Sequence, residues 1–142
     1  MILSGRNQIG LTGREIEYCL KAWVVLCGDK KRELVIIEAS RHSSRTRFNE
    51  LDGKVYLGAD VKPSNGIEAN SRMSILACLA HELAHAERFE LGFQRSISLP
   101  DCLIDESETS LHASFHPVLG PKDREDLIED ARDRLNQWFV EK

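Results

Sequence analysis

The five residues at positions 81–85, His-Glu-Leu-Ala-His, constrain the fold more than any other part of the chain. In a helix, His81 and His85 lie one turn apart on the same face, so both imidazoles can bind one metal ion. The apolar run 75–80 leads directly into this motif, which favours a buried helix. A histidine pair in so apolar a helix needs a polar partner. The motif therefore predicts a metal site that a second segment of the chain must complete.

Glu82 follows the first histidine directly, where its carboxylate can reach a water molecule held on that metal. Zinc lowers the pKa of such a water to about 7, and a nearby carboxylate takes its proton as the water attacks a carbonyl. The motif thus predicts a hydrolase with Zn²⁺ as its cofactor. We expect His81 and His85 to be metal ligands and Glu82 to be the general base.

Length and composition predict a single small enzyme domain over residues 1–142. The net charge of −4 and the scattered basic residues argue against a nucleic-acid partner. No apolar stretch reaches the roughly 18 residues of a membrane span, and residues 1–13 lack the pattern of an export signal. The four cysteines form no CxxC pair, which is typical of free thiols. We therefore expect a cytoplasmic protein.

The first half of the chain predicts one helix and two or three strands. A capping-box pattern at Thr12 and Glu15 begins a helix over 13–27, and Gly28 ends it. The apolar run 34–37 indicates a buried strand, whereas the polar segment 40–49 is either a loop or an exposed strand. A further strand is expected over 54–60.

The second half predicts three helices. The motif helix is expected over about 71–91, a third helix over about 102–115, and a last helix from Gly120-Pro121. Because so few strands exclude a barrel or sandwich, the predicted fold class is α+β. In the last helix we expect Leu127 and Ala131 to face the core and Asp126 and Asp130 to face solvent.

A catalytic zinc needs a third protein ligand and an open position for water. The acidic candidates after the motif are Asp105, Glu106 and Glu108. Glu106 shares its helix face with the small Ser110 and Ala113, which would allow close approach to the motif helix. Glu108 instead lies on the apolar stripe of its helix and is expected to face inward. The residues alone leave the choice open, with Glu106 preferred.

The motif and the segment 104–110 together resemble gluzincin metallopeptidases, of which thermolysin is the familiar type. In that family a ligand glutamate follows HExxH by about twenty residues, in a phrase like Asn-Glu-x-x-Ser-Asp. The resemblance, which covers about residues 50–116, implies that Glu106 is the third ligand. The chain departs from the family at Ser110, where an aspartate that orients a ligand histidine would stand. Asp105 is a candidate replacement.

A second register remains open. Small peptidases that cleave phage repressors carry a phrase in which the ligand glutamate precedes an alanine by five residues. Glu108 and Ala113 match that spacing. His112 and His116 also stand four residues apart, but no acid lies between them and Pro117 ends the helix. His112 is a candidate oxyanion donor, although the residues do not assign that role.

The resemblance implies a minimal zincin fold: a helix, a small twisted sheet, the active-site helix and a following ligand helix. It further implies that a peptide substrate adds to an edge strand, here 54–60. The expected activity is that of a zinc endopeptidase with one or few protein targets, acting in the control of stress or phage defence. Two alternatives are a non-catalytic zincin-like binding module and an amidohydrolase of the deformylase type. The intact Glu82 argues against the first, and the missing Gly-Cys-Leu-Ser phrase against the second.

Overall fold

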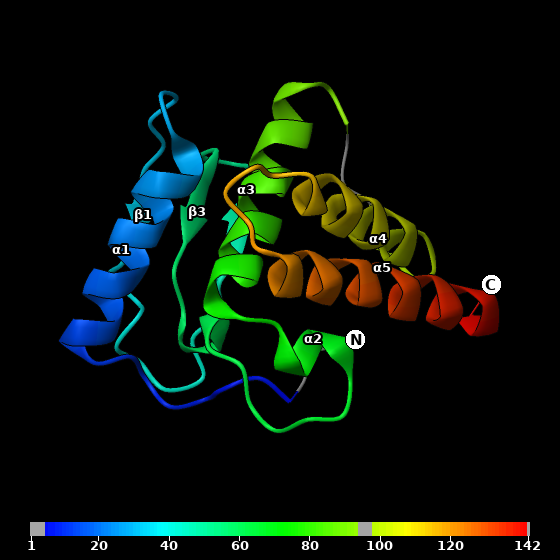
Figure 1. Cartoon of the computed structure of the whole chain (residues 1–142), viewed down its shortest axis with the longest axis horizontal. Helices are drawn as coiled ribbons and strands as arrows, with labels where there is room; N and C mark the ends of the chain where they lie inside the picture. Colours follow the sequence, from blue (N-terminus) through cyan, green and yellow to red (C-terminus); the bar gives the residue numbers. More distant parts are fainter. Residues whose placement is uncertain (1–4, 94–97, 142) are drawn as a thin grey trace.

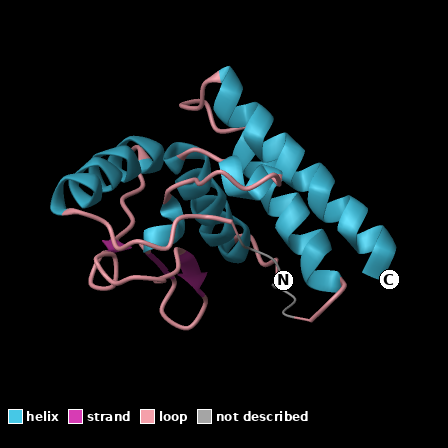
Figure 2. Cartoon of the chain, turned by 90° about the horizontal axis from the view of Figure 1, so that it is seen from below, coloured by secondary structure: helices cyan, strands magenta, loops and turns pink. Residues whose placement is uncertain are grey.

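The computed structural model describes residues 5–93 and 98–141. Helix α3 lies at the centre, with α1 and a small sheet on one side and the paired helices α4 and α5 on the other (Figure 1). The view from below shows the same division (Figure 2). The elements are α1 (Gly13–Cys27), β1 (Leu34–Val35), β2 (Arg47–Asn49), β3 (Lys54–Tyr56), the 3₁₀ helix η1 (Ala59–Val61), α2 (Ala69–Arg72), α3 (Ile75–Glu90), α4 (Asp101–Ser114) and α5 (Pro121–Glu141). The predicted α+β class is confirmed.

Helix α1 has the predicted bounds because both of its ends are specified locally. The Thr12 hydroxyl accepts a hydrogen bond from the Glu15 amide at 3.2 Å, and the Glu15 carboxylate accepts one from the Thr12 amide at 2.9 Å. Its buried face presents Trp23, whose indole N–H donates to the Arg32 carbonyl at 2.8 Å. Gly28 ends the helix at φ 59°, a conformation that glycine adopts without steric cost.

The sheet has the strand order β1-β3-β2, with β1 parallel and β2 antiparallel to β3. Its strands are shorter than predicted. The run 34–37 leaves the sheet after Val35, and Ile37 is 72% exposed. The segment 40–49, left open between loop and strand, supplies β2 at its end. The expected strand 54–60 ends at Tyr56 and continues into η1.

The prediction that 54–60 forms an edge strand is wrong. β3 pairs with β1 through Leu34 and Val55 and with β2 through Phe48 and Val55, so its main chain is bonded on both sides. The cause is the return of 47–49 as a strand, which sequence alone left undecided. An added peptide cannot pair with β3.

The expected helix 71–91 is divided into α2 and α3 by a break at Met73. The Ser74 hydroxyl caps α3 by accepting a bond from the Ala77 amide at 3.0 Å. On the other side of the break, the Arg6 guanidinium donates to the carbonyls of Asn70 (2.6 Å) and Met73 (2.9 Å). Because Arg6 satisfies carbonyls that a continuous helix would bond itself, the break is stable. It also sets where the motif helix begins.

Small polar side chains dominate the buried face of α4. Ser107, Thr109, Ser110 and Ser114 are buried there, with Leu103 and Ala113. Their size lets α4 pack against both α3 and α5, and their hydroxyls need partners once they are buried. The Ser107 hydroxyl, for example, donates to the Ala131 carbonyl of α5 at 2.9 Å. The interface of these three helices is therefore polar as well as packed.

The prediction that Asp126 and Asp130 face solvent is wrong. Both are buried on α5 beside Leu127 and Ala131, which do face the core as expected. Lys122 pairs with Asp126 at 2.5 Å, and Asp130 is bonded from α4 and from its own helix. Such partners offset part of the cost of burying the two carboxylates. Amphipathic periodicity could not reveal these partners.

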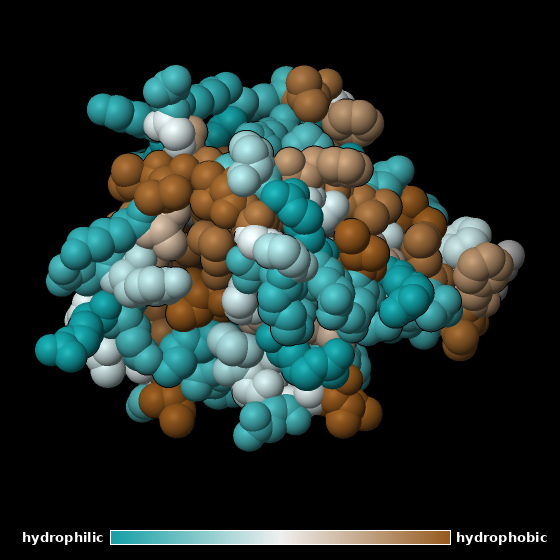
Figure 3. All heavy atoms as spheres, viewed as in Figure 1, coloured by the Kyte–Doolittle hydropathy of each residue, from teal (hydrophilic) through white to brown (hydrophobic). Residues whose placement is uncertain are grey.

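None of the described helices is long and apolar enough to cross a lipid bilayer. Apolar side chains do reach the surface, and in the view of Figure 3 their largest continuous area lies toward α1. Val24 and Val25 of α1 are exposed.

Glu90 at the end of α3 offers a test of the packing between α3 and the segment after α1. Its carboxylate bonds Arg32 and Lys30, each at 2.6 Å, and these two bonds lower the pKa of Glu90 to about 2. Glu90→Gln should lower the free energy of unfolding by less than about 1 kcal/mol at neutral pH, because the side chains of Glu90 and Lys30 are exposed to solvent. The depressed pKa gives stability that is complete above pH 4.5 and lost as pH falls toward 2. Urea midpoints should therefore converge between variant and wild type on acidification; a gap independent of pH would contradict this role.

Candidate metal centre

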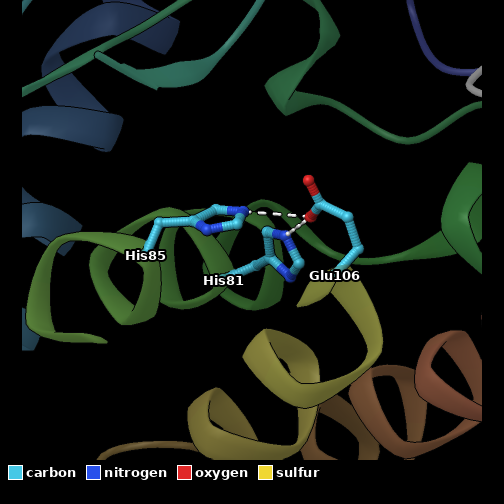
Figure 4. A group of neighbouring side chains, drawn as sticks. All are labelled: His81, His85 and Glu106. Atoms are coloured by element: carbon cyan, nitrogen blue, oxygen red, sulfur yellow. Dashed lines mark hydrogen bonds and ion pairs between the residues drawn. The ribbon is translucent and has the colours of Figure 1, made fainter. Parts of the chain in front are cut away.

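His81 and His85 of α3 and Glu106 of α4 form one group of possible metal ligands (Figure 4). The Nε2 atoms of the two imidazoles point to the same Glu106 oxygen, Oε1, at 2.8 Å and 3.0 Å. Both histidines are buried, and the Glu106 side chain is 21% exposed. Nitrogen and oxygen ligands on a tetrahedral zinc lie about 3.4 Å apart, given bonds of about 2.0–2.1 Å. A shift of Glu106 by less than about 1 Å would lengthen its distances to the two Nε2 atoms to that value.

Hydrogen bonds behind the rings determine which nitrogen of His81 is protonated. The Ser110 hydroxyl donates to Asp130 Oδ2 at 2.6 Å, and it lies 2.8 Å from His81 Nδ1. A hydroxyl has one proton, and here it goes to the carboxylate, so Ser110 can only accept from His81. The Nδ1 atom is therefore a donor. In the neutral ring the Nε2 lone pair then faces Glu106.

His85 is arranged in the same way, with a longer contact. The Thr109 hydroxyl donates to the Asp105 carbonyl at 2.8 Å and lies 3.5 Å from His85 Nδ1. Because its proton is committed to the carbonyl, Thr109 can only accept from the ring. Both imidazoles thus present an Nε2 lone pair to the same carboxylate oxygen.

Two lone pairs facing a carboxylate repel unless positive charge lies among them. Protons on the rings or a metal cation would provide that charge. Burial raises the pKa of Glu106, but when protons occupy the Nε2 atoms, hydrogen bonds from His81 and His85 outweigh burial and hold the pKa well below its usual value. The donor set of two imidazoles and one carboxylate is one that a cation such as zinc accepts. The group therefore fits a metal ion.

Arg134 of α5 closes a ring of polar contacts around the group. Its Nε bonds Asp130 Oδ2 at 2.8 Å, and its Nη1 lies 4.0 Å from Glu106 Oε1. Burial lowers the pKa of Arg134, but the charges of Asp130 and Glu106 outweigh it and raise the pKa above its usual value. We call His81, Ser110, Asp130, Arg134 and Glu106 the polar ring. It draws on α3, α4 and α5.

The polar ring borders a cavity. A cavity of about 350 Å³ lies beside α2 and α5, and Asp130 and Arg134 form part of its wall together with Ile67 and Asn70. Glu82 is partly buried, and its charge also acts on Arg134. The predicted general base thus lies in the electrostatic field of the same guanidinium that approaches Glu106.

The remaining sequence candidates lie elsewhere. The structure places Glu106, and not Glu108, beside the histidines; the Glu108 side chain is 57% exposed and lies 3.3 Å from Arg88. Asp105 also pairs with Arg88, at 3.4 Å, and does not bond His81. Asp105 Oδ2 is buried and has no hydrogen-bond partner among the described residues.

The second histidine pair does not converge on a common point. His112 Nε2 lies 3.0 Å from Glu87 Oε1, whereas His116 Nε2 donates to the Leu26 carbonyl at 2.7 Å. Neither belongs to the group of possible ligands found in the described part of the chain.

Sequence reasoning missed Asp130 and Arg134. They stand four residues apart on α5, a spacing that signals an ion pair on one helix face, and this was the available clue. Nothing local indicated that the face would be buried against α4. Comparisons with family models, with curated proteins and with solved structures find no match for this chain. Its chemistry is therefore inferred from its own side chains.

Proposed function

We propose that this chain is a zinc-dependent peptidase that hydrolyses a peptide bond in one or few protein targets. The observation that carries the proposal is the convergence of His81, His85 and Glu106, with Glu82 next to the first histidine. Catalytic zinc sites of peptidases use two histidines and one glutamate, and they leave a fourth position open. The exposed side of Glu106 is consistent with an opening to solvent.

The choice of zinc and of a carboxylate ligand has chemical support. Imidazole nitrogens suit zinc, and the third donor here is an oxygen, whereas the deformylase alternative would need a cysteine. No cysteine belongs to the ligand group among the described residues. When bound, zinc would polarise the substrate carbonyl and lower the pKa of a water in the open position.

The chain's own residues would move the proton and hold the ligands. Glu82 accepts a proton from the attacking water and delivers it to the leaving amine. His81 and His85 would hold the metal through Nε2, because Ser110 and Thr109 accept from the opposite ring nitrogens. Arg134 adds positive charge near Glu82 and Glu106.

A peptide substrate would pair with β2 instead of β3. β2 is bonded to β3 on one side, and the described residues place no strand on its other side. It also packs on the motif helix: Phe48 of β2 contacts Phe89, one turn beyond His85, with ring centroids 5.6 Å apart. An extended peptide added there would run along α3.

We place the reaction in a reducing compartment, the cytoplasm. All four cysteines are free, and burial raises the pKa of Cys19 to about 11 and that of Cys78 to about 12. Thiols so protonated resist oxidation and disulfide exchange.

We further propose a regulatory role in stress or phage defence, which rests on analogy alone.

The proposal predicts one zinc ion per chain and cleavage that depends on it. Protein prepared without chelator should contain stoichiometric zinc by elemental analysis, and chelated protein should regain it. The zinc-loaded protein should create new termini in a library of peptides derived from whole-cell protein, identified by mass spectrometry. Chelated protein and protein reloaded with zinc are the paired controls. Absence of zinc after reloading would overturn the metal site, and zinc-loaded protein that cleaves nothing would overturn the peptidase.

A further inference from the structure

We propose that Asp130 of α5 is a positioning residue for the metal centre, acting on His81 through the Ser110 hydroxyl. The inference rests on the metal-binding part of the proposed function but not on hydrolysis. It assigns to the C-terminal helix a role in holding the metal, which the position of the motif on α3 does not suggest. The contacts run His81 Nδ1–Ser110 Oγ (2.8 Å) and Ser110 Oγ–Asp130 Oδ2 (2.6 Å).

All three residues are shielded from water. Ser110 is 0% exposed, Asp130 1% and His81 5%. Water therefore cannot compete for either hydrogen bond, and each bond is stronger than it would be at the surface. A carboxylate so buried needs compensating charge, which Arg134 supplies at 2.8 Å. His81 Nδ1, Ser110 Oγ and Asp130 Oδ2 thus each take part in a hydrogen bond.

The direction of the two bonds makes the contact chemically specific. Asp130 can only accept, the single Ser110 proton goes to it, and His81 must then donate from Nδ1. Metal-binding histidines commonly donate their other ring N–H to a carboxylate, which fixes the ring and strengthens the ligand. Here a serine stands between the histidine and the carboxylate.

The structure also explains why the carboxylate comes from α5. Ser110 reaches His81 but carries no charge of its own, and Asp105 is paired with Arg88. Asp130 reaches Ser110 from 20 positions further along the chain. The competing explanation is that Asp130 serves only to pair with Arg134 and hold α5 in place. An exchange of side chains between positions 110 and 130 separates the two.

The experiment compares Ser110→Ala, Asp130→Asn, Ser110→Asp and the double variant Ser110→Asp/Asp130→Ser. Zinc affinity is measured by competition with a chromophoric chelator, and circular dichroism reports the fold. The first two variants should bind zinc on the order of 10–100-fold more weakly, the usual cost of losing a partner of a ligand. Ser110→Asp alone should also bind weakly, because two carboxylates then meet. The double variant has one carboxylate again, now next to His81, and should recover most of the affinity.

Asp126→Asn is the matched control, because Asp126 is also buried on α5 but pairs with Lys122. It should leave zinc affinity unchanged. Folded Asp130→Asn with wild-type affinity would overturn the proposal, as would a folded double variant that recovers nothing. If Asp130 served only to pair with Arg134, the folded double variant would not recover zinc affinity.

A second readout works without metal. Nitrogen-15 NMR of metal-free protein should show a proton on His81 Nδ1 in wild type and in the double variant, and no such proton in Ser110→Ala. If wild-type protein failed to bind zinc, the proposed function would be wrong. The NMR measurement would still show whether His81 donates a hydrogen bond to Ser110. An Nδ1 proton equally present in Ser110→Ala would overturn it.

Discussion

Glu82→Gln should bind zinc as wild type does while peptide cleavage falls by a factor on the order of 10²–10⁴, the usual cost of losing a general base. Glutamine keeps the size of the side chain but cannot accept the proton of the attacking water. The measurement is the initial rate on a peptide recovered from the library, with zinc content determined on the same preparation. Because metal and fold are retained, a fall in rate reports proton transfer.

Glu87→Gln is the control for this prediction. Glu87 lies on the same helix but pairs with His112 at 3.0 Å, so its loss should leave cleavage near the wild-type rate. Wild-type cleavage by Glu82→Gln would remove Glu82 from the mechanism. Equal losses in both variants would mean that the helix, and not the base, had been disturbed.

Glu106→Ala should lose zinc and unfold at a lower temperature than wild type, whereas Glu108→Ala should keep its zinc. Glu106 Oε1 lies within 3.0 Å of both histidines, and Glu108 lies at the surface beside Arg88. Two positions on a helix differ by about 200° of rotation, so the two carboxylates cannot both face α3. Loss of an exposed glutamate usually changes stability by within about 0.5 kcal/mol. Elemental analysis and thermal melts of the two variants side by side provide the comparison.

The reverse pattern, metal-free Glu108→Ala beside zinc-loaded Glu106→Ala, would move the site to the register of the repressor-cleaving peptidases. Thermal melts repeated in excess chelator separate the effect of the metal from that of the side chain. In chelator, wild type and Glu108→Ala should both lose the stabilisation that bound zinc provides.

What the sequence predicted well was specified by local chemistry. The capping box of Thr12 and Glu15 placed α1 to the residue, and Pro121 placed the start of α5. The spacing of His81 and His85 required a helix to bring the imidazoles together, and that helix is present. The proximity of Glu106 to them was favoured by resemblance and by the small neighbours on its face.

What it predicted poorly depends on contacts between distant segments. The break before Ser74 is stabilised by Arg6, more than 60 positions earlier in the chain. β3 became a central strand only because 47–49 returned beside it. Asp130 was predicted to face solvent because it is charged and several of its neighbours in the sequence are also charged. Its burial follows from a hydroxyl on α4 and a guanidinium one turn along α5.

The polar packing of α4 means that the two sides of the molecule are held together by different forces. Around α1, the sheet and α3, the core is a continuous apolar cluster that extends to Ala113, Leu119 and Leu127, and its strength varies with temperature. Between α3, α4 and α5, buried hydroxyls, two aspartates and the ligand group take up much of the interface. Such an interface responds to protons and cations. The packing of α3, α4 and α5 is therefore expected to depend on pH and on bound cations more strongly than the packing of the apolar cluster does.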